Sequence, residues 1–261
     1  MDAADLQKIQ ILLFVCLFSA LLLGEVVAPL FPPPVSPWRH ARRNLGLTAI
    51  NGILNKGLIA GIAAMVSMTE INHFGFFNYF SFNSVVELIL SLALLDFCNY
   101  AMHRLKHAVP FLWRFHKVHH SDPHLNITSS ARFHPGETLF TLVFQAGLVF
   151  VFGISFWSLM LYFLLMGVAV QLNHANIQLP LKLDRAVRLV FVSPYMHKTH
   201  HSKCVVETDS NFSDILSLWD RIFGTYLDRE RYDDLKLGLA DYADDEPLSI
   251  AGMLKAPFTK M

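Results

Sequence analysis

Histidines are the residues of this chain most capable of chemistry, and eight of them fall into three short motifs. The first motif has the spacing His-x-x-x-His, and the other two have the spacing His-x-x-His-His. Within a helix, residues three or four positions apart share a face, so each motif is expected to aim its rings at one point. Neutral imidazole is a good ligand for iron, zinc, copper or nickel. The motif residues are His103 and His107, then His116, His119 and His120, then His197, His200 and His201.

Eight imidazoles exceed the ligands that one metal ion ordinarily takes, so the motifs predict two ions. A single motif arises easily by chance, whereas three motifs on one expected face argue against ordinary surface or core histidines. His174 and His134 are further candidate ligands, because each lies at an expected membrane boundary. His40 and His73 are expected to be ordinary surface or core residues.

Acidic and amide side chains near the motifs are candidates to orient metal-bound rings. A ligating imidazole usually donates its other N–H to a carboxylate, a carbonyl or water. Asp96 and Asn99 lie on the same helical face as His103, and a carboxylate at membrane depth needs such a partner. The candidates near the other motifs are Glu137, Glu207, Asp209, Asn211 and Asp220.

The composition is typical of a membrane protein. The chain is 53% hydrophobic and 16% charged, whereas soluble domains contain about a quarter charged residues. The formal net charge is +0, so no overall basic field suggests nucleic-acid binding. The 3 cysteines lie far apart without a Cys-x-x-Cys pair, so we expect free thiols and no disulfide framework.

Four apolar runs predict five membrane crossings. Residues 11–30, 47–68 and 84–102 each suit one transmembrane helix. Residues 138–173 are too long for one crossing at about 1.5 Å per residue, so we expect a two-helix hairpin turning at residues 153–155. The expected fold is all-α: three transmembrane helices plus a two-helix membrane hairpin, and a cytoplasmic, histidine-rich helical cap that holds a di-metal centre.

Charge predicts the orientation. Arg39, Arg42 and Arg43 lie in an expected loop after the first run, whereas residues 70–83 contain no Lys or Arg. Basic loops favour the cytoplasm, so residues 32–46 are expected there, and counting crossings brings all three motifs to the same side. The expected location is a bacterial inner membrane or the endoplasmic reticulum.

Six segments between residues 85 and 227 extend the histidine motifs in a fixed order. Together they resemble the fatty acid hydroxylase superfamily, which includes sterol desaturases, methyl-sterol oxidases and sphingolipid hydroxylases. The segments are His103-Arg-x-x-His107, Leu112-Trp-Arg-Phe-His116-x-Val-His119-His120-Ser121, Arg132-Phe-His134-Pro, His174-Ala-Asn176, Pro194-x-x-His197-x-x-His200-His201-Ser202 and Trp219-Asp-Arg-Ile-Phe-Gly-Thr225.

The resemblance implies a membrane-embedded, non-haem di-iron oxygenase acting on lipids, with the eight motif histidines, His174 and His134 as ligands. It divides the chain into N-terminal membrane helices and a linker (residues 1–84), the di-iron domain (85–227) and a C-terminal tail (228–261). No fused cytochrome b5 domain is evident, so electrons are expected from a separate donor of the cytochrome b5, ferredoxin or reductase type.

The expected reaction is hydroxylation or desaturation of a C–H bond in a fatty acyl, sphingolipid or sterol-like lipid. Alkyl C–H bonds resist acid–base chemistry, whereas a redox metal that activates O2 can attack them. Demethylation or ether cleavage at the same metals is a related alternative, and zinc is expected to substitute for iron in purified material.

Two alternatives come from other classes of protein. A zinc-dependent membrane hydrolase would need a general-base Glu, as in His-Glu-x-x-His, and this motif is absent. A metal transporter would spread ionisable residues through its membrane segments, where the apolar runs contain only Glu25, Lys56, Glu87 and Asp96.

Overall fold

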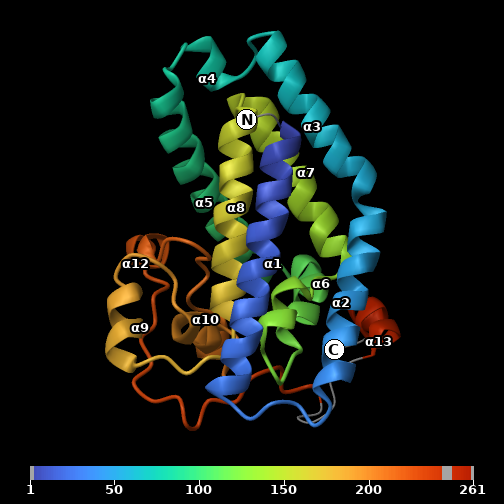
Figure 1. The fold of residues 1–261 in the computed structure, drawn as a ribbon, viewed down its shortest axis with the longest axis vertical. Helices are drawn as coiled ribbons and strands as arrows, with labels where there is room; N and C mark the ends of the chain where they lie inside the picture. The colour runs from blue at the N-terminus through green and yellow to red at the C-terminus, as the bar shows by residue number, and fades with distance from the viewer. Residues whose placement is uncertain (1–2, 243–248, 260–261) are drawn as a thin grey trace.

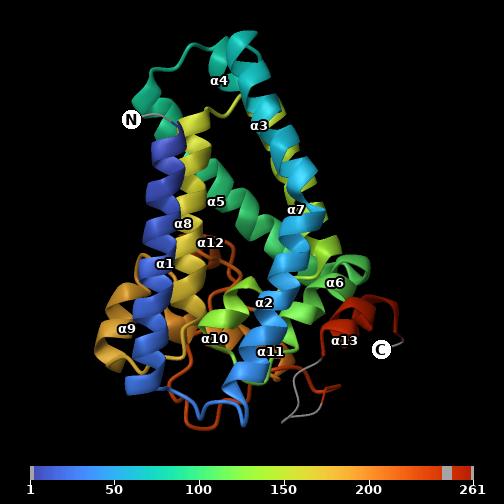
Figure 2. The ribbon, with the colours of Figure 1, turned by 45° about the vertical axis from the view of Figure 1, so that its right-hand side comes forward.

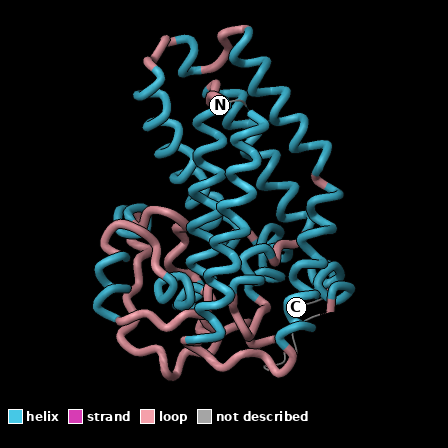
Figure 3. The backbone as a smooth tube through the Cα atoms, viewed as in Figure 1, coloured by secondary structure: helices cyan, strands magenta, loops and turns pink. Residues whose placement is uncertain are grey.

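The computed structural model describes residues 3–242 and 249–259, which fold into helices joined by loops (Figure 3). Within these two ranges β pairing is limited to three isolated bridges, which confirms the expected all-α fold. By length and composition, 4 helices can cross a membrane, or up to 5 segments if a bent helix pair counts as one. The five predicted crossings agree with the upper number.

The first two crossing segments are α1 and the bent pair of α2 and α3. Their bounds are Ala3–Val27, Pro37–Leu54 and Lys56–Ile71. The bend between α2 and α3 is 53°. The prediction of a loop at residues 38–44 is wrong, because Pro37 lies in the first turn of α2, where its missing N–H is harmless and its fixed φ favours a helix.

The third crossing segment, α5 (Ser84–Ala108), follows the single-turn helix α4 (Phe76–Tyr79). α5 extends past the predicted apolar run, so His103 and His107 lie on its last two turns. The side chain of Asn83 caps its first turn. The first histidine motif is therefore fixed by the same rigid helix that crosses the membrane.

The predicted membrane hairpin is confirmed as α7 (Pro135–Phe152) and α8 (Phe156–His174). Gly153 ends α7 with φ 65°, a left-handed conformation that glycine adopts without a Cβ penalty. Glu87 of α5 binds the turn: it accepts hydrogen bonds from the N–H and hydroxyl of Ser155, at 3.1 and 3.0 Å. This anchor explains why an acidic side chain is tolerated inside an apolar helix.

All the short helices except α4 gather at one end of the molecule, opposite to α4 (Figures 1 and 2). At the same end lie the end of α1, the start of α2 and the ends of α5 and α8 (Figure 1). The three histidine motifs thus meet at one end, as the crossing count predicts, while the side of the membrane that this end faces stays a prediction. The short helices at this end are α6 (Pro110–His120), η1 (Ile127–Ala131), α9 (Leu181–Val187), α10 (Pro194–His200), α11 (Val205–Thr208), α12 (Leu218–Ile222), α13 (Ile250–Lys255) and η2 (Ala256–Phe258).

The described part of the C-terminal tail packs against the histidine-bearing end. Leu235 and Leu237 belong to a buried cluster with Leu125. Met253 belongs to another with Val118, which lies inside the second histidine motif. The tail therefore covers the end of the molecule that carries the histidines.

Candidate metal centre

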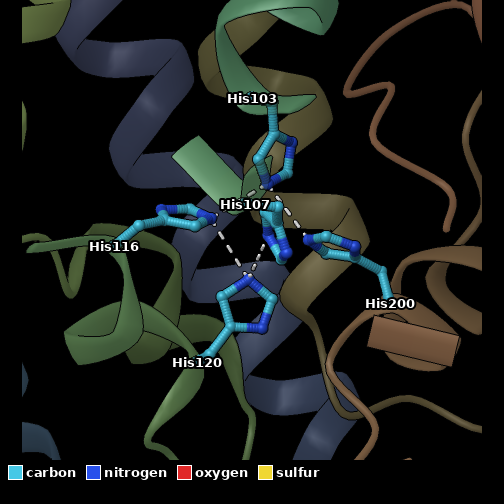
Figure 4. Close-up of side chains that lie close together, drawn as sticks. All are labelled: His103, His107, His116, His120 and His200. Atoms are coloured by element: carbon cyan, nitrogen blue, oxygen red, sulfur yellow. Dashed lines mark hydrogen bonds between the residues drawn. The ribbon is translucent and has the colours of Figure 1, made fainter. Parts of the chain in front are cut away.

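Nine histidines form two adjacent groups of side chains. In each group every residue offers one ring nitrogen, and these nitrogens lie within 4.8 Å of one another. The first group contains His103, His107, His116, His120 and His200 (Figure 4). The second group contains His119, His174, His197 and His201.

Each His-x-x-His-His motif is divided between the two groups. In the earlier motif, His116 and His120 join the first group and His119 joins the second. The later motif divides in the same way, with its outer histidines together. The prediction that each motif aims at one point is wrong, because residues four apart differ by about 40° around a helix, whereas adjacent ones differ by about 100°.

The rings of the first group converge through their Nε2 atoms. Nε2 of His103 lies 3.1 Å from that of His116 and 3.0 Å from that of His200. Nε2 of His120 lies 3.2 Å from those of His116 and His107. Figure 4 shows these rings pointing toward one another, with dashed lines at the four close nitrogen pairs.

The second group has the same geometry. Nε2 of His174 lies 3.2 Å from those of His119 and His197, and Nε2 of His201 lies 3.1 Å from that of His197. The two groups adjoin, since the rings of His120 and His201 stack with centroids 4.4 Å apart.

The outward ring nitrogen, Nδ1, of His197 and of His201 has no hydrogen-bond partner within the described residues. In six other grouped histidines, this nitrogen faces an acceptor that contains no proton to donate. Four of these acceptors are backbone carbonyls and two are carboxylates. The carbonyls are Phe212 for His103 (2.7 Å), Ser210 for His200 (2.7 Å), Val170 for His174 (2.8 Å) and Arg132 for His119 (3.3 Å). The carboxylates are Glu137 for His116 (2.7 Å) and Asp209 for His107 (3.1 Å).

These acceptors fix the ring tautomers. Nδ1 carries the proton, so Nε2 is left with a bare lone pair. Two facing lone pairs cannot form a hydrogen bond with each other, and a cation between them would satisfy both. The close Nε2 pairs are therefore better understood as ligand atoms than as hydrogen bonds.

Burial keeps the rings neutral, the form that binds metal. The pKa of each histidine in α6, in α10 and directly after α10 lies well below its ordinary value. Desolvation is the largest cause, and repulsion from neighbouring imidazoles adds to it. These histidines are His116, His119, His120, His197, His200 and His201.

The spacing of the nitrogens fits two transition-metal ions. Metal–imidazole bonds of about 2.0–2.1 Å place neighbouring ligand nitrogens roughly 2.9–3.3 Å apart, for angles between octahedral and tetrahedral. The Nε2 separations of 3.0–3.2 Å fall within this range. A set of nitrogen ligands alone suits iron and zinc alike.

Glu137 and Asp209 contact ligand rings as predicted, but Asp96 and Asn99 do not. Asp96 Oδ2 accepts a hydrogen bond from Trp219 Nε1 at 2.8 Å. Asn99 Nδ2 donates to Asp214 Oδ2 at 2.6 Å. Both side chains are engaged by partners in the loop that follows α11 and in α12, so neither binds the ring of His103.

Glu207 and Asn211 also do not contact ligand rings, contrary to the prediction. Glu207 forms an ion pair with Arg229. Asn211, with φ 53°, donates its amide to the carbonyl of Leu227 at 3.0 Å and accepts the N–H of Leu227 at 2.9 Å. Both residues therefore bind neighbouring loops, where they find closer partners than the histidine rings.

Asp220 acts on a ligand only through the backbone. Its carboxylate accepts the N–H groups of Phe212 and Ser213, at 2.8 and 2.9 Å, and the Phe212 carbonyl is the acceptor for His103. Burial raises the pKa of Asp220 above its ordinary value. The residue thus holds the loop that orients a ring, without contacting the ring itself.

His134 lies outside both groups, so the structure does not place it as a ligand. Its Nδ1 accepts the N–H of Gly136 at 2.9 Å, which caps the start of α7. Its Nε2 lies 3.2 Å from the carbonyl of Leu254. His134 precedes the proline that begins α7, so its side chain serves as a helix cap and not as the predicted ligand.

Two charged residues near the rings were missed in the sequence. Lys106 Nζ lies 3.0 Å from Glu137 Oε1, and Asp214 Oδ2 lies 4.0 Å from His103 Nδ1. Burial raises the pKa of Asp214 to about 6. Lys106 could have been found from its place between two ligands on α5, whereas Asp214 lies in a loop with no spacing signal.

His40 belongs to a buried polar network beside the second motif. Its Nε2 lies 2.8 and 2.9 Å from the two carboxylate oxygens of Asp122, and the hydroxyl of Ser129 donates to Asp122 at 2.6 Å. Burial opposes ionisation of Asp122, but His40 and Arg132 outweigh it and hold its pKa well below the usual range. The network fixes the loop between α6 and α7.

Glu25 of α1 joins two further loops at this end. Its Oε1 accepts the N–H groups of Ile127 and Asn176, at 2.6 and 2.8 Å. Asn176 follows His174 by two residues, so this contact holds the end of α8 where a ligand is presented.

One cavity of about 210 Å³ reaches both groups of histidines. Two rings from each group line it, together with side chains of the membrane helices α5, α7 and α8. A molecule within the cavity would therefore meet both metal positions. The lining histidines are His103, His116, His119 and His174.

Comparisons with known proteins agree with this arrangement. A family model described as fatty acid hydroxylase matches residues 88–225, which contain all nine grouped histidines. No solved structure matches the chain significantly.

Three curated relatives are similar over about half of the chain. Ornithine lipid hydroxylase OlsE of Rhizobium tropici is 30% identical over 59% of this chain and 45% of its own length. Alkylglycerol monooxygenase of Xenopus tropicalis is 29% identical over 51% of this chain and 28% of its own. Cholesterol 25-hydroxylase-like protein of Danio rerio is 31% identical over 54% of this chain and 55% of its own.

The chain thus spans about half or less of the length of these relatives. The family match, in contrast, covers more than half of the chain and includes the metal centre. This protein belongs to the fatty acid hydroxylase family.

Proposed function

We propose that this protein is a membrane-embedded oxygenase that hydroxylates or desaturates a C–H bond of a lipid with O2. The lipid is of the fatty acyl, sphingolipid or sterol-like class. The observation that carries the proposal is the single cavity that meets both histidine groups and runs between the membrane helices α5, α7 and α8. The proposed catalytic region is residues 85–227.

The two groups of histidines would hold two iron ions, which supply the activation of O2 that no side chain can provide. The geometry of the nitrogens supports a pair of adjacent ions, and zinc would fit the same ligands in purified material. The carbonyls and carboxylates at Nδ1 keep six of the nine rings in one tautomer and one orientation, so most of the ligand atoms are held before a metal arrives.

The chain also contributes by restricting water. The ring of Phe133 stacks on His119, with centroids 4.5 Å apart, and lines the cavity. Phe163, Met166 and Val170 of α8 form an apolar wall of the same cavity. An acyl chain from the bilayer can enter such a cavity without meeting bulk solvent.

The proposed reaction also needs an electron donor. Hydroxylation consumes one O2, two electrons and two protons, and yields the alcohol and one water. We propose a separate donor of the cytochrome b5, ferredoxin or reductase type, which would reach the histidine-bearing end from the cytoplasm.

The exposed thiol of Cys204 tests this orientation, because it lies between the last histidine motif and α11. A membrane-impermeant maleimide should label it only from the cytoplasmic side of sealed vesicles. Labelling from the opposite side alone would reverse the proposed orientation.

The proposed reaction is tested with protein purified anaerobically in detergent. We expect about two irons per chain. After addition of a reductant, we expect either incorporation of one atom from isotopically labelled O2 into a lipid, for hydroxylation, or a new double bond in the lipid, for desaturation. Zinc that iron cannot replace, with no reaction of the reduced protein with O2, would instead favour a zinc-dependent hydrolase or metal transport.

A further inference from the structure

The wall of the cavity formed by α7 is polar, although α7 is otherwise an apolar membrane helix. Thr138, Thr141 and Gln145 line the cavity. They are three and four residues apart, so they form one stripe on the helix. Polar side chains on one face of a membrane helix are costly unless they have partners, and they mark functional surfaces.

The hydrogen bonds of this stripe are incomplete. The hydroxyls of Thr138 and Thr141 donate to the carbonyls of His134 and Glu137, at 3.4 and 3.0 Å, which leaves their oxygens free to accept. Within residues 3–242 and 249–259, the amide of Gln145 forms no hydrogen bond. An amide without water or a protein partner needs one from whatever occupies the cavity.

The facing side chain from α5 adds a further acceptor. Asn99 lines the cavity and uses its amide N–H to bind Asp214, at 2.6 Å, so its carbonyl oxygen remains available. The cavity therefore offers hydrogen-bonding groups from α5 and α7 opposite the apolar wall from α8. A plain hydrocarbon would complement only the α8 wall.

The charges around the cavity disfavour an anionic group. Glu137 and Asp214 are acidic, and the one lysine that lines the cavity, Lys106, is paired with Glu137 at 3.0 Å. Away from the metal positions, a carboxylate or phosphate in the cavity would meet the Asp214 carboxylate and no unpaired cation from the lining. An uncharged polar group avoids this repulsion.

We propose that the lipid substrate carries an uncharged hydrogen-bonding group, such as an amide, ester or hydroxyl, which binds Gln145 and Thr141 while the oxidised carbon lies at the metals. This inference rests on the proposed function and specifies its substrate class. Gln145 is eight residues from Glu137, the partner of His116, so the bound group lies roughly 12 Å along α7 from that end of the cavity.

The test measures binding of two probes to metal-loaded protein in lipid nanodiscs under nitrogen, so that turnover is not needed. One probe is an N-alkyl amide of a fatty acid, and the other is the straight alkane of matched length. We expect the amide to bind about tenfold tighter, as one hydrogen bond provides. Gln145→Leu should remove this preference and leave alkane binding unchanged.

Gln10→Leu is the matched control, because Gln10 lies on α1 and bonds the carbonyl of Met160, outside this cavity. It should retain the preference, and both variants should retain two metals per chain. Equal binding of the two probes by the wild type, or an unaltered preference in Gln145→Leu, overturns the inference. If the inference fails in this way but the protein still oxidises a lipid, the proposed function survives without the inference. If the wild type prefers the amide but oxidises no lipid, the proposed function is overturned, and the cavity is only a binding site.

Discussion

Glu137 Oε1 lies 2.7 Å from His116 Nδ1, so the first turn of the membrane helix α7 orients a ring carried by α6. The contact is buried on both sides. A carboxylate that accepts from a metal-bound imidazole raises its basicity and fixes its direction.

Glu137→Gln should therefore weaken metal binding at the first group by about 10- to 100-fold. The measurement is competition with a chelator of known affinity. Glu207→Gln is the control, since Glu207 pairs with Arg229 and contacts no grouped histidine. Equal metal affinity in the two variants would refute this role of Glu137.

His174 and His134 form a second matched pair. His174→Ala should lower the metal content from about two ions per chain to about one, because it removes one of four ligands in the second group. His134→Ala should keep both ions and lose about 1 kcal/mol of stability, as expected for a helix cap. Elemental analysis of both purified variants measures the number of metal ions per chain. Loss of metal in His134→Ala would show that His134 is a ligand after all.

The metal-free protein should lose stability as the pH falls below neutrality. The unfolded rings take up protons near pH 6.5, whereas burial lowers the pKa of the histidines in α6 and α10. Protons therefore favour the unfolded chain below about pH 6.5, and the contribution of these rings is present only above that pH.

Asp214 acts in the opposite direction, because its pKa is raised to about 6 and its contribution is lost as the pH rises toward that value. Burial also raises the pKa of Asp209 and Asp220, which act in the same direction as Asp214. These acids are fewer than the histidines, so the histidines should dominate. The measurement is the unfolding temperature of chelated protein between pH 7 and 5. An unfolding temperature that does not fall over this range would contradict the expectation.

The buried pair of His40 and Asp122 predicts a stability effect outside the metal ligands. His40→Ala leaves the Asp122 carboxylate buried without the imidazole that contacts both of its oxygens, which should cost about 3–5 kcal/mol. His73→Asn is the control, because His73 is exposed with φ 50°, a conformation that asparagine tolerates. Thermal unfolding in detergent compares them, and equal stability would show that the network contributes little.

The membrane helices could be predicted because their signal is local. Long apolar runs and the Gly153–Ser155 break determine where the helices of residues 138–173 begin and end. The start of α2 was mistaken for a loop, since three arginines near a proline resemble a basic connection. There, helix propensity and the proline at the first turn outweigh charge.

The metal centre could be predicted as a set of residues but not as two groups. The division of His119 from His120 depends on how α6 faces α8 and α10, which spacing along one helix does not contain. Likewise, the carbonyls of Phe212 and Ser210 have no signature in the sequence, because every residue has a backbone carbonyl. These partners exist only once distant loops have folded against α5 and α10.

The first group draws its ligands from α5, α6 and α10, and the second from α6, α8, α10 and the residue that follows α10. During synthesis, all the membrane-crossing helices leave the ribosome before His197, His200 and His201 do. Neither site can therefore be completed until α8 is in place and α10 has folded back beneath it. A complete site therefore forms only after the membrane helices are in place, so the ion available at that stage would determine which metal fills it.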